Sequence, residues 1–119
     1  MWLFTRHGFY SVVQDKADQQ IIQVRARVKK DLQRLARFAL KEADIEMPAI
    51  ISTPEADYAY RIVVDRPAWL KIGAALTADI DYTNFKSTVH GEADRDATYM
   101  LVWSVMNELQ RRRKNGRDG

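Results

Sequence analysis

The residues best suited to acid–base or metal chemistry in this sequence are its two histidines, His7 and His90. They lie far apart in the sequence, and no complete set of metal ligands at helical spacing surrounds either of them. The sequence contains no cysteine, which excludes disulfides, thiolate metal sites and thiol catalysis. We therefore expect neither a metal ion nor a cofactor.

His7 follows Arg6 in a turn between two apolar runs. Because an imidazole titrates near neutral pH, this pair is suited to acid–base or phosphate chemistry. A histidine exposed in a turn is the simpler interpretation, and no nucleophile elbow or phosphate-binding glycine loop accompanies it. We assign no catalytic residue, and a small enzyme with a site at this turn remains one alternative.

Charge is unevenly distributed along the 119 residues, whose formal net charge is +3. Residues 16–41 hold eight basic groups against two acidic ones, whereas residues 42–99 hold five against eleven. Residues 111–119 add five basic groups and one acidic group. The position of the basic block therefore says more about partners than the net charge does.

Residues 21–27 alternate between apolar and polar side chains, which predicts a half-buried strand. If the apolar positions face the helices, Arg25 and Arg27 face away from them, and Arg61 of a later strand joins the same surface. With Tyr10 nearby, such a surface is typical of platforms for single-stranded nucleic acid. The same alternation places Tyr58 on the face opposite Arg61.

Three interpretations of these arginines stay open. They lie on a solvated sheet face where Arg25 and Arg27 pair with acidic residues of 42–99, they belong to a protein interface, or they contact nucleic-acid phosphates. In the last case, a basic tail from residue 111 would add affinity independent of base sequence. The tail residues concerned are Arg111, Arg112 and Arg113.

Hydrophobic periodicity and turn residues predict strands, helices and one ambiguous segment. Strands are expected over residues 2–5, 9–14, 21–27, 49–53 and 58–64, and helices over residues 29–42, 65–80 and 95–112. Gly8 is expected to supply a positive φ in the first turn, and residues 81–91 form either a short helix or an edge strand. The predicted fold is α+β, ferredoxin-like or related: about five antiparallel strands with two to three helices packed on one face.

The last predicted helix is apolar nearly all round its middle, so it is either deeply buried or has a partner on its second face. We expect this partner to be a protein, or a second copy of this chain. The candidate interface residues are Tyr99, Val102, Trp103 and Met106.

Several segments together resemble a family of small bacterial proteins to which no activity is assigned. They are the start MWLFTRHGFYSVV, the run VRARVKKDLQRL, the pair ADYAYRIVV and DYTNFKSTV, and the helix TYMLVWSVMNELQ. The resemblance spans nearly the whole chain and implies one bacterial domain, and it transfers no site residue to this sequence.

These observations predict a single α+β domain over residues 1–110, followed by a disordered basic tail over residues 111–119. No apolar run is long enough to cross a membrane, and we expect a cytoplasmic protein. The favoured function is non-catalytic protein–protein interaction, with homodimerisation as one form of it. The first alternative is nucleic-acid binding through the arginine-bearing sheet and the tail.

Overall fold

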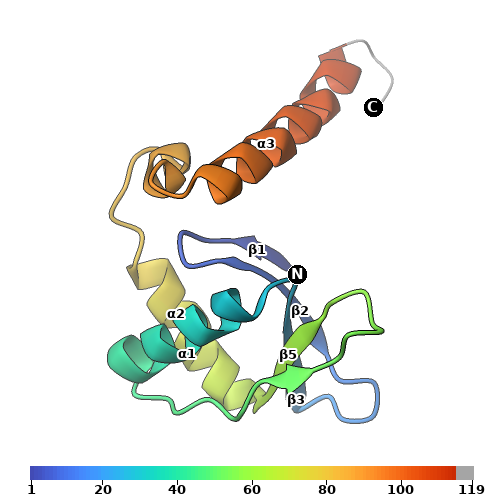
Figure 1. Ribbon diagram of the computed structural model, residues 1–119, viewed down its shortest axis with the longest axis vertical. Coiled ribbons are helices and arrows are strands. Elements are labelled where there is room, and N and C mark those ends of the chain that lie inside the picture. Colours follow the sequence, from blue (N-terminus) through green and yellow to red (C-terminus); the bar gives the residue numbers. More distant parts are fainter. Residues whose placement is uncertain (115–119) are drawn as a thin grey trace. The chain divides into compact units, whose positions relative to one another are not determined.

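The first part of the chain forms a five-stranded antiparallel sheet. The computed structural model describes residues 1–114 (Figure 1), and the chain divides into two compact units, Met1–Asp81 and Tyr82–Gly119. Across the sheet the strand order is β1-β2-β3-β5-β4, and every neighbouring pair is antiparallel. The strands are β1 (Trp2–Phe4), β2 (Phe9–Gln14), β3 (Ile21–Ala26), β4 (Ile51–Ser52) and β5 (Tyr60–Asp65).

Two helices of the first unit, α1 (Lys29–Ala43) and α2 (Arg66–Ala78), contact β3 and β5. The predicted start of the second helix is confirmed, because Asp65 Oδ1 accepts the Ala68 backbone N–H at 2.7 Å and a proline lies in the first turn. The predicted α+β class, with a five-stranded antiparallel sheet and helices packed against it, is confirmed.

The topology follows the β-α-β-β-α order of ferredoxin-like folds from β3 to α2. Strand β5 lies between β3 and β4, so β3, α1 and β4 form a split β-α-β unit. The other neighbour of β3 is β2, which precedes it in the chain. The arrangement is therefore related to the ferredoxin-like fold and differs from it in that strand.

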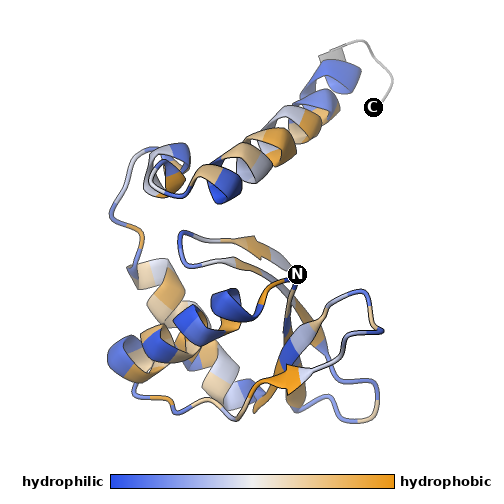
Figure 2. Ribbon diagram, in the orientation of Figure 1, coloured by the Kyte–Doolittle hydropathy of each residue, from blue (hydrophilic) through white to orange (hydrophobic). Residues whose placement is uncertain are grey.

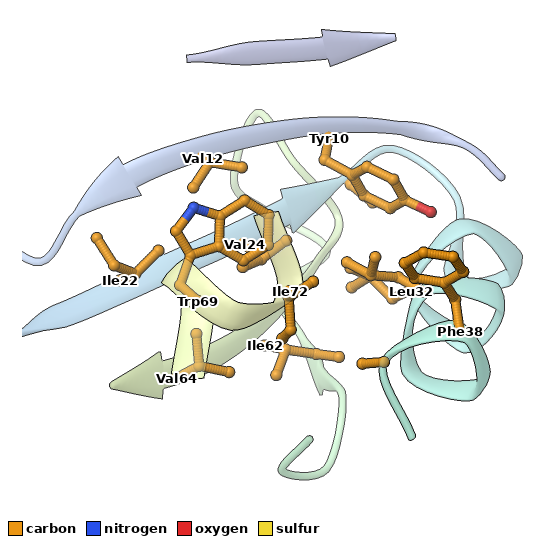
Figure 3. Close-up of a cluster of buried hydrophobic side chains, with 13 residues drawn as sticks. Tyr10, Val12, Ile22, Val24, Leu32, Phe38, Ile62, Val64, Trp69 and Ile72 are labelled. Carbon is orange, nitrogen blue, oxygen red and sulfur yellow. The ribbon is translucent and has the colours of Figure 1, made fainter. Parts of the chain in front are cut away.

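The core lies between this sheet and the two helices. Figure 3 shows side chains of β2, β3 and β5 pointing toward those of α1 and α2. Members without exposed surface include Tyr10, Val24, Leu32, Ile62 and Ile72. No helix of the first unit covers the opposite face of the sheet, and we call that face the open face.

The turn between β1 and β2 needs a glycine for space rather than for backbone conformation. The expected positive φ at Gly8 is wrong, because Gly8 does not lie in the left-handed region. Among the described residues other than glycine, the one positive φ is at Asp44. A Cβ built on Gly8 would lie 2.5 Å from Asp31 Cγ. Asp31, on α1, is buried and accepts the Phe9 backbone N–H at 3.1 Å. Close packing of the turn on α1 therefore requires glycine.

The second unit holds a short 3₁₀-helix, η1 (Phe85–Val89), and a long helix, α3 (Ala93–Lys114). The segment that was ambiguous in the sequence is therefore helical, and Asn84 caps it by accepting the Lys86 N–H at 3.1 Å. The rings of Phe85 and Tyr99 stack at 5.8 Å, which joins η1 to α3. Of the predicted basic tail, residues 111–114 are part of α3, and residues 115–119 lie outside the described residues.

Candidate functional site

One row of side chains crosses the open face at the same level on every strand. The strand register pairs Trp2 with Ser11, Ser11 with Arg25, Arg25 with Arg61, and Arg61 with Ile51. Because successive residues of a strand alternate between its faces, this row lies opposite the buried residues of β3 and β5. The structure thus puts Arg25 and Arg61 directly beside each other.

Neutral partners hold both guanidinium groups. Arg25 Nη2 donates to Ser11 Oγ at 2.7 Å, and Arg61 Nη1 donates to Gln23 Oε1 at 2.6 Å. Arg61 Nε also donates to Thr53 Oγ1 at 3.4 Å. A guanidinium has five N–H donors, so each arginine keeps donors that these protein partners do not use.

No carboxylate within residues 1–114 lies at ion-pair distance from Arg25, Arg27 or Arg61. The third arginine donates from Nη1 to the backbone oxygen of Asp57 at 2.6 Å, not to its carboxylate. The interpretation that Arg25 and Arg27 are paired with acidic residues of 42–99 is therefore wrong. Like charges directly opposite one another destabilise a sheet, and here no carboxylate of the described chain compensates them.

An aromatic ring brings the third arginine into the group. Arg25 Cζ lies 4.7 Å and Arg27 Cζ 4.2 Å from the centroid of the Tyr58 ring. The expectation that Tyr58 faces away from the arginines is wrong, because β5 begins only at Tyr60 and strand alternation does not extend to residue 58. The ring favours the positive charges through cation–π attraction and holds two of them at one place.

A hydrogen-bond relay fixes the orientation of Gln23, which lies between the arginines and the β2–β3 turn. Gln23 Nε2 donates to Asp15 Oδ1 at 2.8 Å, so its Oε1 faces Arg61. This bond, followed by the Ala17 backbone N–H, holds the pKa of the Asp15 carboxyl below its ordinary value. The Gln23 amide thus links the Asp15 carboxylate to the Arg61 guanidinium through two hydrogen bonds, and the two charged groups form no ion pair with each other.

Three aromatic side chains of β1 and β2 share the open face with the arginines. Phe4 stacks on Phe9 at a centroid distance of 4.6 Å, and Trp2 meets Phe9 edge-on at 6.4 Å. Trp2 is 69% exposed. Sequence reasoning missed this cluster, because aromatic residues in short strands are ordinarily assigned to a core. The strand register identifies it: Trp2 pairs with Ser11 and Phe4 pairs with Phe9, so the three aromatic residues lie on the same face of the sheet as Ser11.

Tyr10, which the sequence analysis placed near the arginines, lies on the other face. Its ring is fully buried in the core, and its hydroxyl donates to the Asp31 backbone oxygen at 2.7 Å (Figure 3). That placement was wrong because β2 carries apolar residues at both odd and even positions, so the pattern does not select a face. Phe9, the preceding residue, lies on the face expected of Tyr10.

The predicted interface residues of α3 divide into two groups. Tyr99 stacks within its own unit and Val102 is half-buried, whereas Trp103 and Met106 are 53% and 54% exposed. Figure 2 shows apolar residues along the middle of α3 and hydrophilic ones toward its C-terminal end. The remaining exposed apolar residues of this helix are Leu101, Val105 and Leu109.

The basic residues expected in the tail belong to the last turns of α3. Arg111 Nη1 contacts Glu108 Oε1 at 2.5 Å, one helical turn away. Both Arg112 and Arg113 are exposed. Cations at a helix C-terminus interact favourably with its dipole, so they have a local role whether or not phosphate is present.

The turn that holds Arg6 and His7 is concave on its helix side. A pocket of about 390 Å³ there is lined by His7 and by residues of α1, together with Asp79 after α2. Asp79 Oδ2 contacts His7 Nε2 at 2.8 Å and Arg6 Nε at 3.1 Å. Burial disfavours the charged form of Arg6, but Asp81 and Asp79 outweigh that effect, so its pKa lies above the ordinary value.

Among residues 1–114, no three histidine or carboxylate side chains are grouped as metal ligands would be. None of the helices in that part of the chain is long and apolar enough to cross a membrane. No protein-family model, curated protein or solved structure matches this chain. The chemistry of its own surfaces therefore carries the functional argument.

Proposed function

We propose that the open face binds single-stranded nucleic acid. The observation that carries this proposal is the pair Arg25 and Arg61, directly opposed and without a carboxylate of the described chain in reach. A phosphate group accepts two parallel hydrogen bonds from one guanidinium and neutralises the repulsion between two of them. A bound phosphate thereby supplies the negative charge that no carboxylate of the described chain supplies to this pair of arginines.

The aromatic cluster supports a single strand over a duplex. Trp2 and Arg25 lie two strands apart on one row, which corresponds to about 10 Å between their Cα atoms. An exposed indole offers a stacking surface for an unpaired base while the guanidinium contacts the backbone. In a duplex the bases are already stacked on each other, so Trp2 would have no base to contact.

The first test is the affinity of a fluorescein-labelled single-stranded oligonucleotide, measured by anisotropy over a range of salt concentrations. The logarithm of the association constant should fall linearly with the logarithm of the salt concentration, with a slope of about −0.7 for each phosphate contacted. The double variant Arg25→Gln/Arg61→Gln should bind more weakly and reduce that slope by about 0.7, because the two guanidinium groups share one phosphate. The matched control, Lys30→Gln/Lys71→Gln, removes two charges from the helices and should leave the slope nearly unchanged.

A second pair of variants tests stacking. Trp2→Ala should weaken binding of the single strand by about 1–3 kcal/mol, whereas Leu70→Ala removes an equally exposed apolar side chain of α2 and should have no effect. A duplex competitor should bind less well than the single strand. Absence of binding at low salt, or equal binding by both double variants, would reject the proposal.

A second candidate function is self-association through α3. Five apolar residues of this helix are more than half exposed: Leu101, Trp103, Val105, Met106 and Leu109. The described helix also has acidic residues in its first turn, Asp94 and Asp96, and a basic cluster at its end. Two copies packed antiparallel would place the acidic start of each helix beside the basic end of the other. Such an interface is symmetric, as most homodimers require.

Sedimentation velocity over a concentration series tests this candidate. The protein should be dimeric, and Val105→Glu should make it monomeric, because the new carboxylate would be buried in the apolar part of the interface. Ser104→Glu adds the same charge at an exposed polar position on the side of α3 away from these apolar residues and should remain dimeric. A monomer at high micromolar concentration would exclude this function and leave the open face as the one candidate.

A further inference from the structure

The pocket beside the β1–β2 turn is a second site on the first unit, on the helix side of the sheet. Its volume of about 390 Å³ falls within the range of sites for small molecules. One wall is the exposed side of α1, where Arg34, Arg37 and Lys41 occupy positions three and four residues apart on one helix face. His7 and Asp79 also line the pocket.

The charges around this pocket favour an anion. Asp79 is already engaged by Arg6 and His7, so its carboxylate is compensated within the chain. Neither Arg37 nor Lys41 forms an ion pair or hydrogen bond with any residue of the described chain. Glu42 is the remaining carboxylate in the lining, and it offsets part of the positive charge without removing it.

His7 is held in one orientation at the edge of the pocket. Its ring packs on the Phe38 ring at a centroid distance of 4.7 Å, and its Nε2 lies 2.8 Å from Asp79 Oδ2. An ionised carboxylate accepts hydrogen bonds and donates none, so Nε2 carries the proton of that bond. Nδ1 has no hydrogen-bond partner in residues 1–114, and in the protonated ring it is a further donor to an anion.

We propose that this pocket binds a small molecule that carries a phosphate group. The guanidinium of Arg37 would hold two phosphate oxygens, as planar guanidinium groups do. Lys41 would add a point charge, and the fixed imidazole of His7 a directional contact. A ligand of this kind differs from the strand expected on the open face, and the two sites do not share a residue.

Binding is measured with two defined probes, inorganic phosphate and phenyl phosphate, by titration of ¹⁵N-labelled protein in NMR spectra. Both should give saturable shifts of amides near Arg37, Lys41 and Asp79, and of the His7 ring. Phenyl phosphate should bind more tightly than inorganic phosphate, because a pocket of about 390 Å³ holds more than a phosphate group and Phe38 is part of its lining. Shifts centred on Arg25 and Arg61 instead would overturn the assignment to this pocket.

Two variants with opposite expected effects keep the proposal falsifiable. Arg37→Gln/Lys41→Gln, at two exposed positions, should weaken phenyl phosphate binding at least about 10-fold. Glu42→Gln removes a negative charge from the lining and should tighten binding by about 2- to 5-fold. Lys16→Gln/Lys71→Gln removes two charges elsewhere in the first unit and should match the unmodified protein. No saturable shift at millimolar phosphate, or the same affinity in all three variants, would overturn the proposal.

The proposals for the two sites fail independently. An oligonucleotide that binds with no effect of Arg37→Gln/Lys41→Gln leaves the open-face proposal intact. If phenyl phosphate binds the pocket while the protein binds no oligonucleotide, only the open-face proposal is rejected.

Discussion

The two faces of one sheet treat polar groups in opposite ways. On the covered side, Tyr10 of the sheet and Asp31 of α1 are buried, and both form hydrogen bonds within the chain. On the open face, Arg25 and Arg61 lie side by side with neutral partners only. The first arrangement stabilises the fold, whereas the second tolerates a repulsion that an external anion would relieve.

Neighbouring residues of β5 show the same contrast within one strand. Ile62 points into the core and has no exposed surface, whereas Arg61 points to the open face and is half-buried. A protein selected only for stability would be expected to pair the arginine with a carboxylate across the strand. The difference teaches that the covered face serves folding, and it is the reason for our proposal that the open face contacts another molecule.

The largest effect is expected for Ile62→Ala. Removing a fully buried side chain between the sheet and the helices should lower the free energy of unfolding by about 2–5 kcal/mol. The measurement is urea-induced unfolding followed by circular dichroism. Oligonucleotide affinity, measured where the variant is still folded, should be unchanged. A variant that unfolds normally but binds more weakly would contradict the division between the two faces.

Gly8→Ala should have the next largest effect. The added methyl group would lie 2.5 Å from Asp31 Cγ, so the carboxylate that holds the Phe9 N–H has to move. We expect a loss of about 1–3 kcal/mol in the free energy of unfolding, as for other overpacked sites. Gly73→Ala is the matched control, because nothing lies within 4 Å of its new Cβ. This second variant should gain about 0.5–1 kcal/mol, since alanine favours the helix. Equal stability of the two variants would show that the turn does not pack on α1 as described.

Much of this division could be predicted from sequence wherever one periodicity is unambiguous. The alternation over residues 21–27 fixed the side of Arg25, because apolar residues occupy every second position of that strand. Asp65 and Pro67 located the start of α2, since both act through the local geometry of a helix N-terminus. These features depend on a few consecutive residues, and local physics is enough to predict them.

The rest depended on contacts that no local pattern encodes. Strand β2 is apolar on both faces, so the sequence could not show that Phe9 rather than Tyr10 lies on the same face of the sheet as the arginines. The contact between His7 and Asp79 joins positions 72 residues apart in the chain. The sequence also could not show that Arg25 lacks a carboxylate partner, because acidic residues are frequent in residues 42–99, where a partner was expected.

Arg61→Gln should change stability slightly, and in the direction opposite to most substitutions. Removing one of two opposed positive charges should raise the free energy of unfolding by about 0.2–1 kcal/mol at low ionic strength. The gain should disappear in high salt, where exposed charges are screened. Urea unfolding at two salt concentrations measures it, with Lys71→Gln as the single-charge control. A loss of stability that does not depend on salt would mean that the bond from Arg61 to Gln23 outweighs the repulsion.

The smallest effect is expected from Asp15, at the end of the relay to Arg61. Hydrogen bonds from Gln23 and from the Ala17 backbone hold its pKa below the ordinary value in the folded protein. A group with a lowered folded-state pKa stabilises the fold above its unfolded pKa of about 3.9. That stabilisation is lost as the pH falls through the folded value, because protonation then favours the unfolded chain.

Asp15→Asn keeps an acceptor for Ala17 but not the charge. The unmodified protein should therefore be the more stable of the two near neutral pH, and the difference should close in acid. An NMR titration of the Asp15 carboxyl carbon gives the midpoint directly, and a midpoint at or above the ordinary value would show that Gln23 is not oriented by a charge, so that its hold on Arg61 needs another explanation.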